Sequence, residues 1–202
     1  KAKVDATLDT KTGTVTAGKD AALSAGALKV THEGMSATTR GRVEATIGYV
    51  SDFEDVELKM ESPDGVKVNF PPLAWLGARI KWYVLEKDGS KVIANRLDNV
   101  LFQRTMNFFG GEDMTNYVIE ANVMTDGNRR IKSEVGLINQ RYKISLVGNK
   151  NVLEVSSNYE RVQQAVKFPV KANQWYHLKT HVKNNGDGSG EVRAKAWTKG
   201  ED

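Results

Sequence analysis

Short runs in which apolar and polar residues alternate dominate the second half of the chain. The run from Tyr117 to Val123 places its apolar side chains on one face, with Glu120 and Asn122 on the other. The same alternation recurs in the runs 142–146, 176–182 and 192–196. Successive side chains of an extended strand point to opposite sides, so each run buries one face and exposes the other. The pattern predicts antiparallel β-strands.

Turn residues separate these runs. Asp64–Gly65, Asp88–Gly89 and Asp126–Gly127 are dipeptides typical of hairpins, and the stretches 148–151 and 184–190 are rich in glycine and asparagine. The only alanine-rich stretch, 21–27, is short and interrupted by glycine, so helical signals are scarce. The sequence therefore predicts an all-β protein of the sandwich or barrel kind.

The character of the strands changes near residue 47. Earlier strands are short and rich in threonine, alanine and glycine, as in part of a small Ig-like sandwich, whereas later ones are longer and include all four tryptophans. We predict an Ig-like β segment at 1–47 that is partial, because cores of that size are marginal on their own, and a second domain at 48–202. We expect Trp175 and Trp197 to cap the core between two sheets, and Trp75 to fill a core or an edge.

Two sets of motifs resemble known families. Residues 173–179 (Asn-Gln-Trp-Tyr-His-Leu-Lys), followed by a turn and 190–197 (Gly-Glu-Val-Arg-Ala-Lys-Ala-Trp), resemble the paired late strands of concanavalin A-like (laminin G-like) jelly rolls. Residues 113–117, 123–130 and 136–142 resemble the region that follows the propeller in large pyrroloquinoline-quinone-type β-propeller proteins of planctomycete and verrucomicrobial bacteria. In those proteins an Ig-like segment precedes a jelly roll that begins near an Asp-Phe-Glu motif, here Asp52–Glu54.

The resemblance covers the chain from about Ala25 onward and implies a concanavalin A-like jelly-roll β-sandwich preceded by a short Ig-like β segment. It also implies one or two closing strands beyond Asp202, so we expect either a piece of a larger protein or a sheet that another chain completes. The propeller repeats themselves are absent. The implied location is periplasmic, cell-surface or extracellular, and the implied neighbours are the protein's own propeller or other chains.

Composition narrows the possible chemistry. The 29 Lys and Arg residues exceed the 25 Asp and Glu residues by only four, and they are spread along the chain, which argues against a nucleic-acid partner. The sequence has no cysteine, which excludes disulfides, zinc–thiolate sites and cysteine nucleophiles. No apolar run approaches the ~20 residues that a membrane span needs.

Metal and cofactor signals are weak. His177 and His181 are four residues apart on a predicted strand, which separates them by about 13 Å, too far for one zinc ion. The loop Asn185–Glu191 resembles the start of a calcium loop, but the twelfth position is Ala196 rather than glutamate. We predict no cofactor, and the jelly-roll resemblance leaves a structural calcium ion open.

Catalytic signals are weaker still. No Gly-x-Ser-x-Gly motif occurs. Glu120, Glu134 and Glu154 fall on predicted strands, and glycoside hydrolysis needs two carboxylates about 5 to 9.5 Å apart, but the sequence does not bring any two of them together. We therefore favour a protein without catalytic activity.

The candidate site is a set of polar, planar side chains on the expected concave sheet, chosen because such groups make paired hydrogen bonds to sugar hydroxyls or carboxylates. Its members are Arg129, Arg130, Asn139, Gln140, Arg141, Glu154 and Asn158, and Tyr142 or Trp82 offers a flat surface for a sugar ring. The alternative is that Arg129 and Arg130 pair with Asp126 and Glu134 while Asn139–Gln140 forms a turn.

The favoured function is a non-catalytic carbohydrate-binding or cell-envelope module of a larger exported bacterial protein, with a glycan or cell-envelope polysaccharide as partner. Two alternatives stay open: a structural scaffold that packs on a propeller or other chains, and a glycoside-acting enzyme of the jelly-roll type.

Overall fold

The computed structural model describes residues 3–99, 101 and 105–201. The chain divides into two compact units, residues 1–111 and 112–202. Every named element is a β-strand, and all strand pairs are antiparallel, so the prediction of an all-β protein is confirmed. The predicted boundary after residue 47 falls inside the first unit and stays a prediction.

The first unit contains two separate hairpins and one four-stranded sheet. Strand β1 (Thr7–Leu8) pairs with β2 (Val15–Thr16), and β3 (Ser24–His32) pairs with β4 (Met35–Val43). The sheet has the order β5 (Met60–Glu61), β6 (Lys67–Asn69), β7 (Trp82–Lys87) and β8 (Ser90–Asn95). Asp64–Gly65 and Asp88–Gly89 form the predicted turns, the latter with both φ angles positive, as a tight hairpin turn requires.

An aromatic cluster forms part of the core of the first unit. Trp75 is 8% exposed, its ring lies 4.6 Å from that of Phe109 in a stacked arrangement, and Phe53 meets it edge-on at 5.6 Å. Rings in these arrangements gain energy beyond the area they bury. The expectation that Trp75 fills a core is confirmed.

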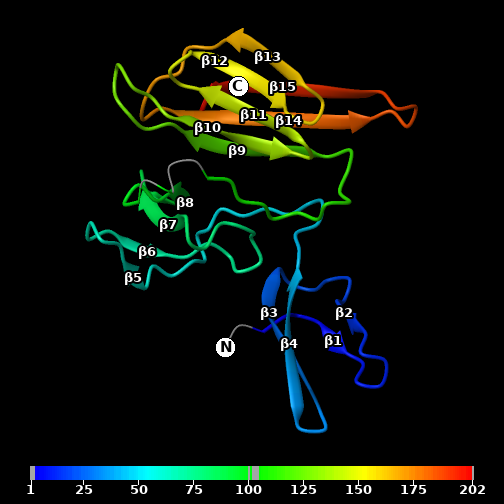
Figure 1. The fold of residues 1–202 in the computed structure, drawn as a ribbon. Coiled ribbons are helices and arrows are strands. Elements are labelled where there is room, and N and C mark those ends of the chain that lie inside the picture. The colour runs from blue at the N-terminus through cyan, green and yellow to red at the C-terminus, as the bar shows by residue number, and fades with distance from the viewer. Residues whose placement is uncertain (1–2, 100, 102–104, 202) are drawn as a thin grey trace. The chain divides into compact units, whose positions relative to one another are not determined.

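The second unit is a sandwich of two antiparallel sheets (Figure 1). One has the order β10 (Glu134–Asn139), β11 (Tyr142–Val147), β12 (Val152–Ser157) and β13 (Val162–Lys167). The other has the order β15 (Gly190–Thr198), β14 (Trp175–Asn184) and β9 (Val118–Met124).

The core of this unit comes from the alternation seen in the sequence. Ile144 and Leu146 of one sheet and Leu178 of the other are fully buried and belong to one hydrophobic cluster. Burying a side chain of this size stabilises the fold by about 1.5–3 kcal/mol. The residues between them on each strand point to the other side of their sheet, where His177 and Lys179 reach solvent but Ser145 is buried.

The two sheets of the sandwich do not have equal numbers of strands. All six residues of β13 are exposed, and Val166 is 62% exposed although it pairs with Leu153, which is 7% exposed. Among the described residues, no strand pairs with the outer edge of β15. The four strands β10 to β13 follow one another as a meander, and the finer jelly-roll connection stays a prediction.

Candidate functional site

The structure does not bring the seven predicted site residues together. Arg129 and Arg130 lie in the loop before β10, whereas Asn139 ends β10 and Gln140 and Arg141 follow it. A strand of six residues separates these two groups by about 20 Å. Asn158 lies in the turn between β12 and β13, and Glu154 is on the outer face of its sheet. The predicted single cluster is therefore corrected.

Asn139 and Gln140 hold the sandwich together. Asn139 is fully buried, and its Nδ2 donates to the backbone oxygens of Tyr117 at 3.1 Å and Thr180 at 3.3 Å. Gln140 has a φ of 55° and lies beyond the last residue pair of β10 and β11. Its Nε2 donates to the carbonyl of Val182 at 3.3 Å. These amides link β10 to the opposite sheet. The alternative interpretation, a turn at Asn139–Gln140, is one residue out of register: Asn139 is the last residue of β10 and pairs with Tyr142, so Gln140 and Arg141 form the turn.

Arg141 is engaged at the surface near the same turn. Its Nη1 donates to Glu160 Oε1 at 2.9 Å, and its guanidinium lies 4.2 Å from the ring centre of Tyr159. The hydrogen bond to Glu160 raises the pKa of Arg141. These contacts fix the guanidinium against its neighbours.

Three glutamates considered for catalysis each face a lysine. Glu120 lies 2.8 Å from Lys179, and the hydrogen bond from that lysine lowers the pKa of Glu120. Burial raises the pKa of Glu134, but hydrogen bonds from Lys143 and Ser145 outweigh it, so the net pKa is lowered. A general acid in glycoside hydrolysis needs a raised pKa. Neither Glu120 nor Glu134 has the raised pKa that a general acid needs.

Glu154 is buried on the outer face of the four-stranded sheet. It accepts a hydrogen bond from Gln163 Nε2 at 3.0 Å, and Lys150 Nζ lies 3.6 Å away. Its partners are neighbours within the same sheet, so this carboxylate belongs to a local polar network.

The outer face of the three-stranded sheet carries a group of neighbouring aromatic side chains, here called the aromatic row: Trp175, His177 and Trp197. Trp197 on β15 pairs directly with His177 on β14, and Trp175 lies two residues before His177 on the same face. The intervening Tyr176 is buried, which places the row on the opposite, solvent-facing side. The expectation that Trp175 and Trp197 cap the core between the sheets is therefore wrong for both residues.

Cationic groups contact the rings of this row. The His177 and Trp197 ring centres are 4.5 Å apart, and Lys195 Nζ lies 4.6 Å from the Trp197 ring centre. Lys199 Nζ lies 5.8 Å from the ring centre of Trp175. Among the described residues, neither Lys195 nor Lys199 has a carboxylate partner.

Hydrogen-bonding groups border the row on β9. His177 Nδ1 lies 3.1 Å from Asn122 Oδ1, and His177 Nε2 lies 3.7 Å from Glu120 Oε2. Asn122 and Glu120 are exposed, so each keeps hydrogen-bonding capacity toward solvent. The face thus combines flat rings, an amide, a carboxylate and amines.

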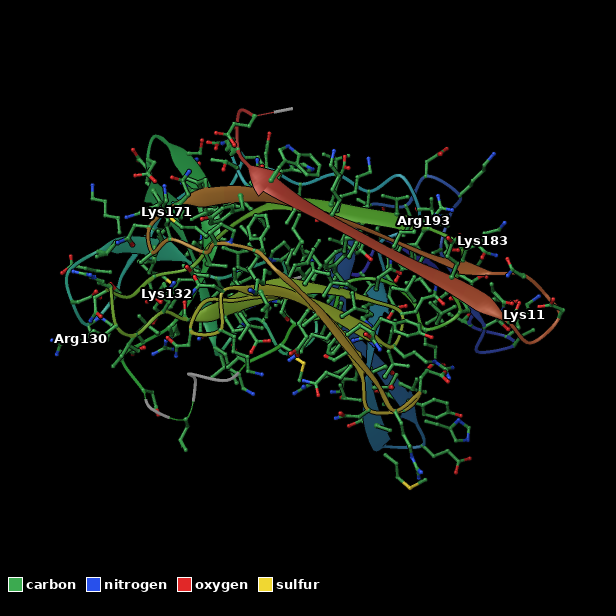
Figure 2. The ribbon with its side chains drawn as sticks, turned by 90° about the horizontal axis from the view of Figure 1, so that it is seen from above. Lys11, Arg130, Lys132, Lys171, Lys183 and Arg193 are labelled. Atoms are coloured by element: carbon green, nitrogen blue, oxygen red, sulfur yellow. The ribbon has the colours of Figure 1, made fainter. Side chains whose placement is uncertain are left out.

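A hollow of about 390 Å³ lies at the end of the sandwich where β9 ends and β14 begins. Figure 2 shows Lys132 and Lys171 at this end, with Arg130 beyond them, and Lys183 and Arg193 at the other end of β14 and β15. The lining residues are Gly127, Asn128, Arg129, Lys132, Val170, Lys171, Ala172 and Asn173. A larger hollow in the first unit, lined by residues 3–7 and 18–21, carries balanced charges and no aromatic ring.

No group of three or more His, Cys, Asp or Glu side chains in the described part of the chain is placed to hold a metal ion. Within those same residues, no helix has the length and hydrophobicity that crossing a bilayer requires.

Comparison of the sequence with family models found no match, and comparisons with curated proteins and with solved structures found none either. The resemblance to the region after bacterial β-propellers stays a prediction.

Sequence reasoning missed the aromatic row, although a signal for it was present. Trp197 has the same strand parity as Arg193 and Lys195, which alternation assigns to solvent, and Trp175 has the parity of His177. Trp82, considered as a surface for a sugar ring, belongs to the first unit.

Proposed function

We propose that the second unit is a non-catalytic carbohydrate-binding module whose binding face is the aromatic row. The observation that carries this proposal is that Trp175, His177 and Trp197, all half-buried, lie together on the outer face of one sheet. Strand pairing fixes the spacing of the rings: Trp197 lies across from His177 on the next strand, and Trp175 lies two residues along β14. The rings together form a platform on which the flat faces of sugar rings can stack.

The energetics of the face support sugar stacking. Lys195 contacts the Trp197 ring, but a cation–π contact at an exposed site is worth only about 0.5–1 kcal/mol. A pyranose ring can therefore replace the ammonium group at small cost, and the released lysine then donates to sugar oxygens. Asn122 and Glu120 lie beside the row and provide the paired acceptors and donors that vicinal hydroxyls need.

The lowered pKa values of Glu120 and Glu134 support binding over hydrolysis, because neither carboxyl is held protonated near neutral pH. A binding module of this kind fits within a larger exported bacterial protein, as the resemblance implies.

Affinity gel electrophoresis of the full chain through gels that contain single polysaccharides tests the proposal. Trp197→Ala is expected to weaken retention at least fivefold, since stacking of a planar ligand group on one aromatic ring, as measured for nucleic-acid bases, is worth about 1–3 kcal/mol. The matched control is Tyr159→Ala, which removes a 76% exposed ring from the same unit away from the row. Arg141→Ala is also expected to leave retention unchanged.

Equal retention of wild type and Trp197→Ala would contradict this function. So would the absence of retention of the wild type on every neutral and acidic polymer tested.

A second candidate function, an assembly scaffold, is favoured by the open side of the sandwich. Val162 and Val166 point toward the core side of β13 yet are 37% and 62% exposed, and Tyr159 stands beside them. Exposed apolar side chains next to an unpaired strand edge are typical of surfaces that another chain covers. Sedimentation velocity of wild type against Val166→Lys would reveal such an association.

A further inference from the structure

The hollow at the end of the sandwich is built from two loops that the fold ties together. The loop 125–133 joins β9 to β10, and the loop 168–174 joins β13 to β14. Asn173 donates its backbone N–H to the carbonyl of Thr125 at 2.8 Å, and Lys132 Nζ donates to the carbonyl of Val170 at 2.6 Å. The two loops are thus held in fixed proximity although they are about forty residues apart in sequence.

Local interactions also fix the first loop. Asn128 Oδ1 accepts hydrogen bonds from the backbone N–H groups of Arg130 at 2.8 Å and Ile131 at 3.0 Å. Gly127 has a φ of 110°, and a Cβ atom there would lie 2.2 Å from the carbonyl oxygen of Ile131. Only glycine fits this backbone. The hollow is therefore shaped before any ligand arrives.

The cations around the hollow divide into two kinds. Lys132 has a structural role, because its ammonium group donates hydrogen bonds to Asn151 Oδ1 at 2.7 Å and to the backbone carbonyl of Val170. Arg129 and Lys171, which line the hollow, and Arg130 beside it have no carboxylate partner in the described part of the chain. The alternative pairing of Arg129 and Arg130 with Asp126 and Glu134 does not occur, since Glu134 pairs with Lys143.

The chemistry of these cations suits an oxyanion. A guanidinium group presents parallel N–H donors that match a carboxylate or sulfate, and a nearby ammonium adds a point charge. Unpaired cations that already stand together repel each other, and a bound anion removes that repulsion. A hollow of about 390 Å³ is large enough for a sugar ring together with its acidic group.

The hollow also adjoins the aromatic row. Asn173, which lines the hollow, precedes Trp175 by two residues, and Met124, which ends β9, pairs with Trp175. A chain of sugars lying along the row and leaving it at Trp175 would therefore reach the hollow directly.

We propose that the hollow lined by Arg129 and Lys171 binds the carboxylate or sulfate group of an acidic polysaccharide. The polysaccharide part of this inference rests on the proposed function, whereas the binding of an oxyanion does not. The module accordingly binds acidic glycans more tightly than neutral ones. The row stacks against sugar rings, and the hollow binds their negatively charged groups.

The test compares the full-length wild type with the double variant Arg129→Gln/Lys171→Gln. The control is Arg161→Gln/Lys167→Gln, which removes the same charge from exposed positions of the same unit. Gels contain polygalacturonate, dextran sulfate, or a neutral β-glucan. Retention on the two acidic polymers is expected to weaken at least tenfold in the hollow variant and less than twofold in the control, with retention on the neutral polymer unchanged in both.

A second measurement separates the inference from the proposed function. Sodium sulfate and sodium glucuronate are titrated into the ¹⁵N-labelled protein, and backbone amide shifts are followed. Saturable shifts confined to residues 127–132 and 171–173, and absent in the hollow variant, are expected. They would support the oxyanion site even if no polymer were retained, which would itself contradict the carbohydrate-binding function.

Three results would overturn the inference. Equal losses in the hollow and control variants would show non-specific charge attraction. Equal retention of the wild type on acidic and neutral polymers would be consistent with carbohydrate binding but would contradict the preference for acidic polysaccharides. Retention of single-stranded DNA that exceeds retention of both acidic polysaccharides, and that depends on Arg129 and Lys171, would assign the hollow to nucleic-acid phosphates.

Discussion

Asn139 offers the most direct test of how the sandwich is held together. The side chain is fully buried, and its amide donates to the backbone oxygens of Tyr117 and Thr180. Replacement with alanine removes one hydrogen bond from each of two backbone oxygens inside the sandwich, and each loss costs about 2 kcal/mol. Because Asn139 Oδ1 is itself buried without a partner, its removal recovers about 1 kcal/mol.

The expected net loss for Asn139→Ala is therefore about 3 kcal/mol. A unit of about 90 residues has a free energy of unfolding of roughly 5–14 kcal/mol, so this is a large fraction of its stability. With a urea m-value of about 1 kcal/mol/M, the midpoint of unfolding falls by about 3 M.

The assay is urea unfolding followed by the amide cross-peaks of residues in β10, β11 and β14, which report on the second unit alone. Asn158→Ala in the exposed turn between β12 and β13 is the control and is expected to change the free energy of unfolding by less than about 0.5 kcal/mol. A midpoint that moves by less than 0.5 M in Asn139→Ala, together with a tenfold loss of polysaccharide retention, would refute the reasoning. It would restore Asn139 to the binding role that the sequence suggested.

Two further predictions concern the same unit. A Cβ at Gly136 would lie 2.1 Å from a backbone carbonyl oxygen of β11, so Gly136→Ala is expected to lower the free energy of unfolding by about 2 kcal/mol or more, measured by urea unfolding. The control is Gly186→Ala in an open loop, which is expected to cost about 1 kcal/mol through its positive φ alone. The pKa of Glu120 is lowered from 4.5, chiefly by the hydrogen bond from Lys179. The ion pair therefore stabilises the fold above pH 4.5, and this stabilisation is lost as the pH falls through the lowered pKa. The difference in melting temperature between wild type and Lys179→Gln should therefore shrink on acidification from pH 6 to pH 3, and a difference independent of pH would contradict the assignment.

The strands and their faces were predictable because side-chain alternation is a local property of two residues. Along β14, Tyr176 and Leu178 are buried and His177 is not, as the pattern indicates. Strand β10 is less clear, since Val135, Leu137 and Ile138 are apolar at both parities. The orientation of Asn139 was therefore ambiguous in the sequence, and its polarity was taken as a sign of binding.

The site depended on contacts that the sequence does not encode locally. Arg129 and Arg141 flank the same strand, and their closeness in sequence suggested one cluster, although the strand holds them apart. Lys171 joins Arg129 only because the β13–β14 loop crosses to the β9–β10 loop, a pairing across about forty residues. The open side of β13 likewise follows from the unequal number of strands in the two sheets.

The row and the hollow are held in place by different interactions. The row depends on strand pairing, whereas the hollow depends on hydrogen bonds between two loops. Strand pairing fixes the positions of Trp197 and His177, so in the proposed function the row offers the same ring spacing to any sugar chain and adds affinity with little selectivity. The hollow is formed by loops that Gly127, Asn128 and Lys132 stiffen, and Arg129 and Lys171 line it without a carboxylate partner among the described residues. In the proposed function, the row therefore supplies stacking energy that neutral and acidic glycans share, and the unpaired cations of the hollow supply the energy that distinguishes an acidic glycan from a neutral one.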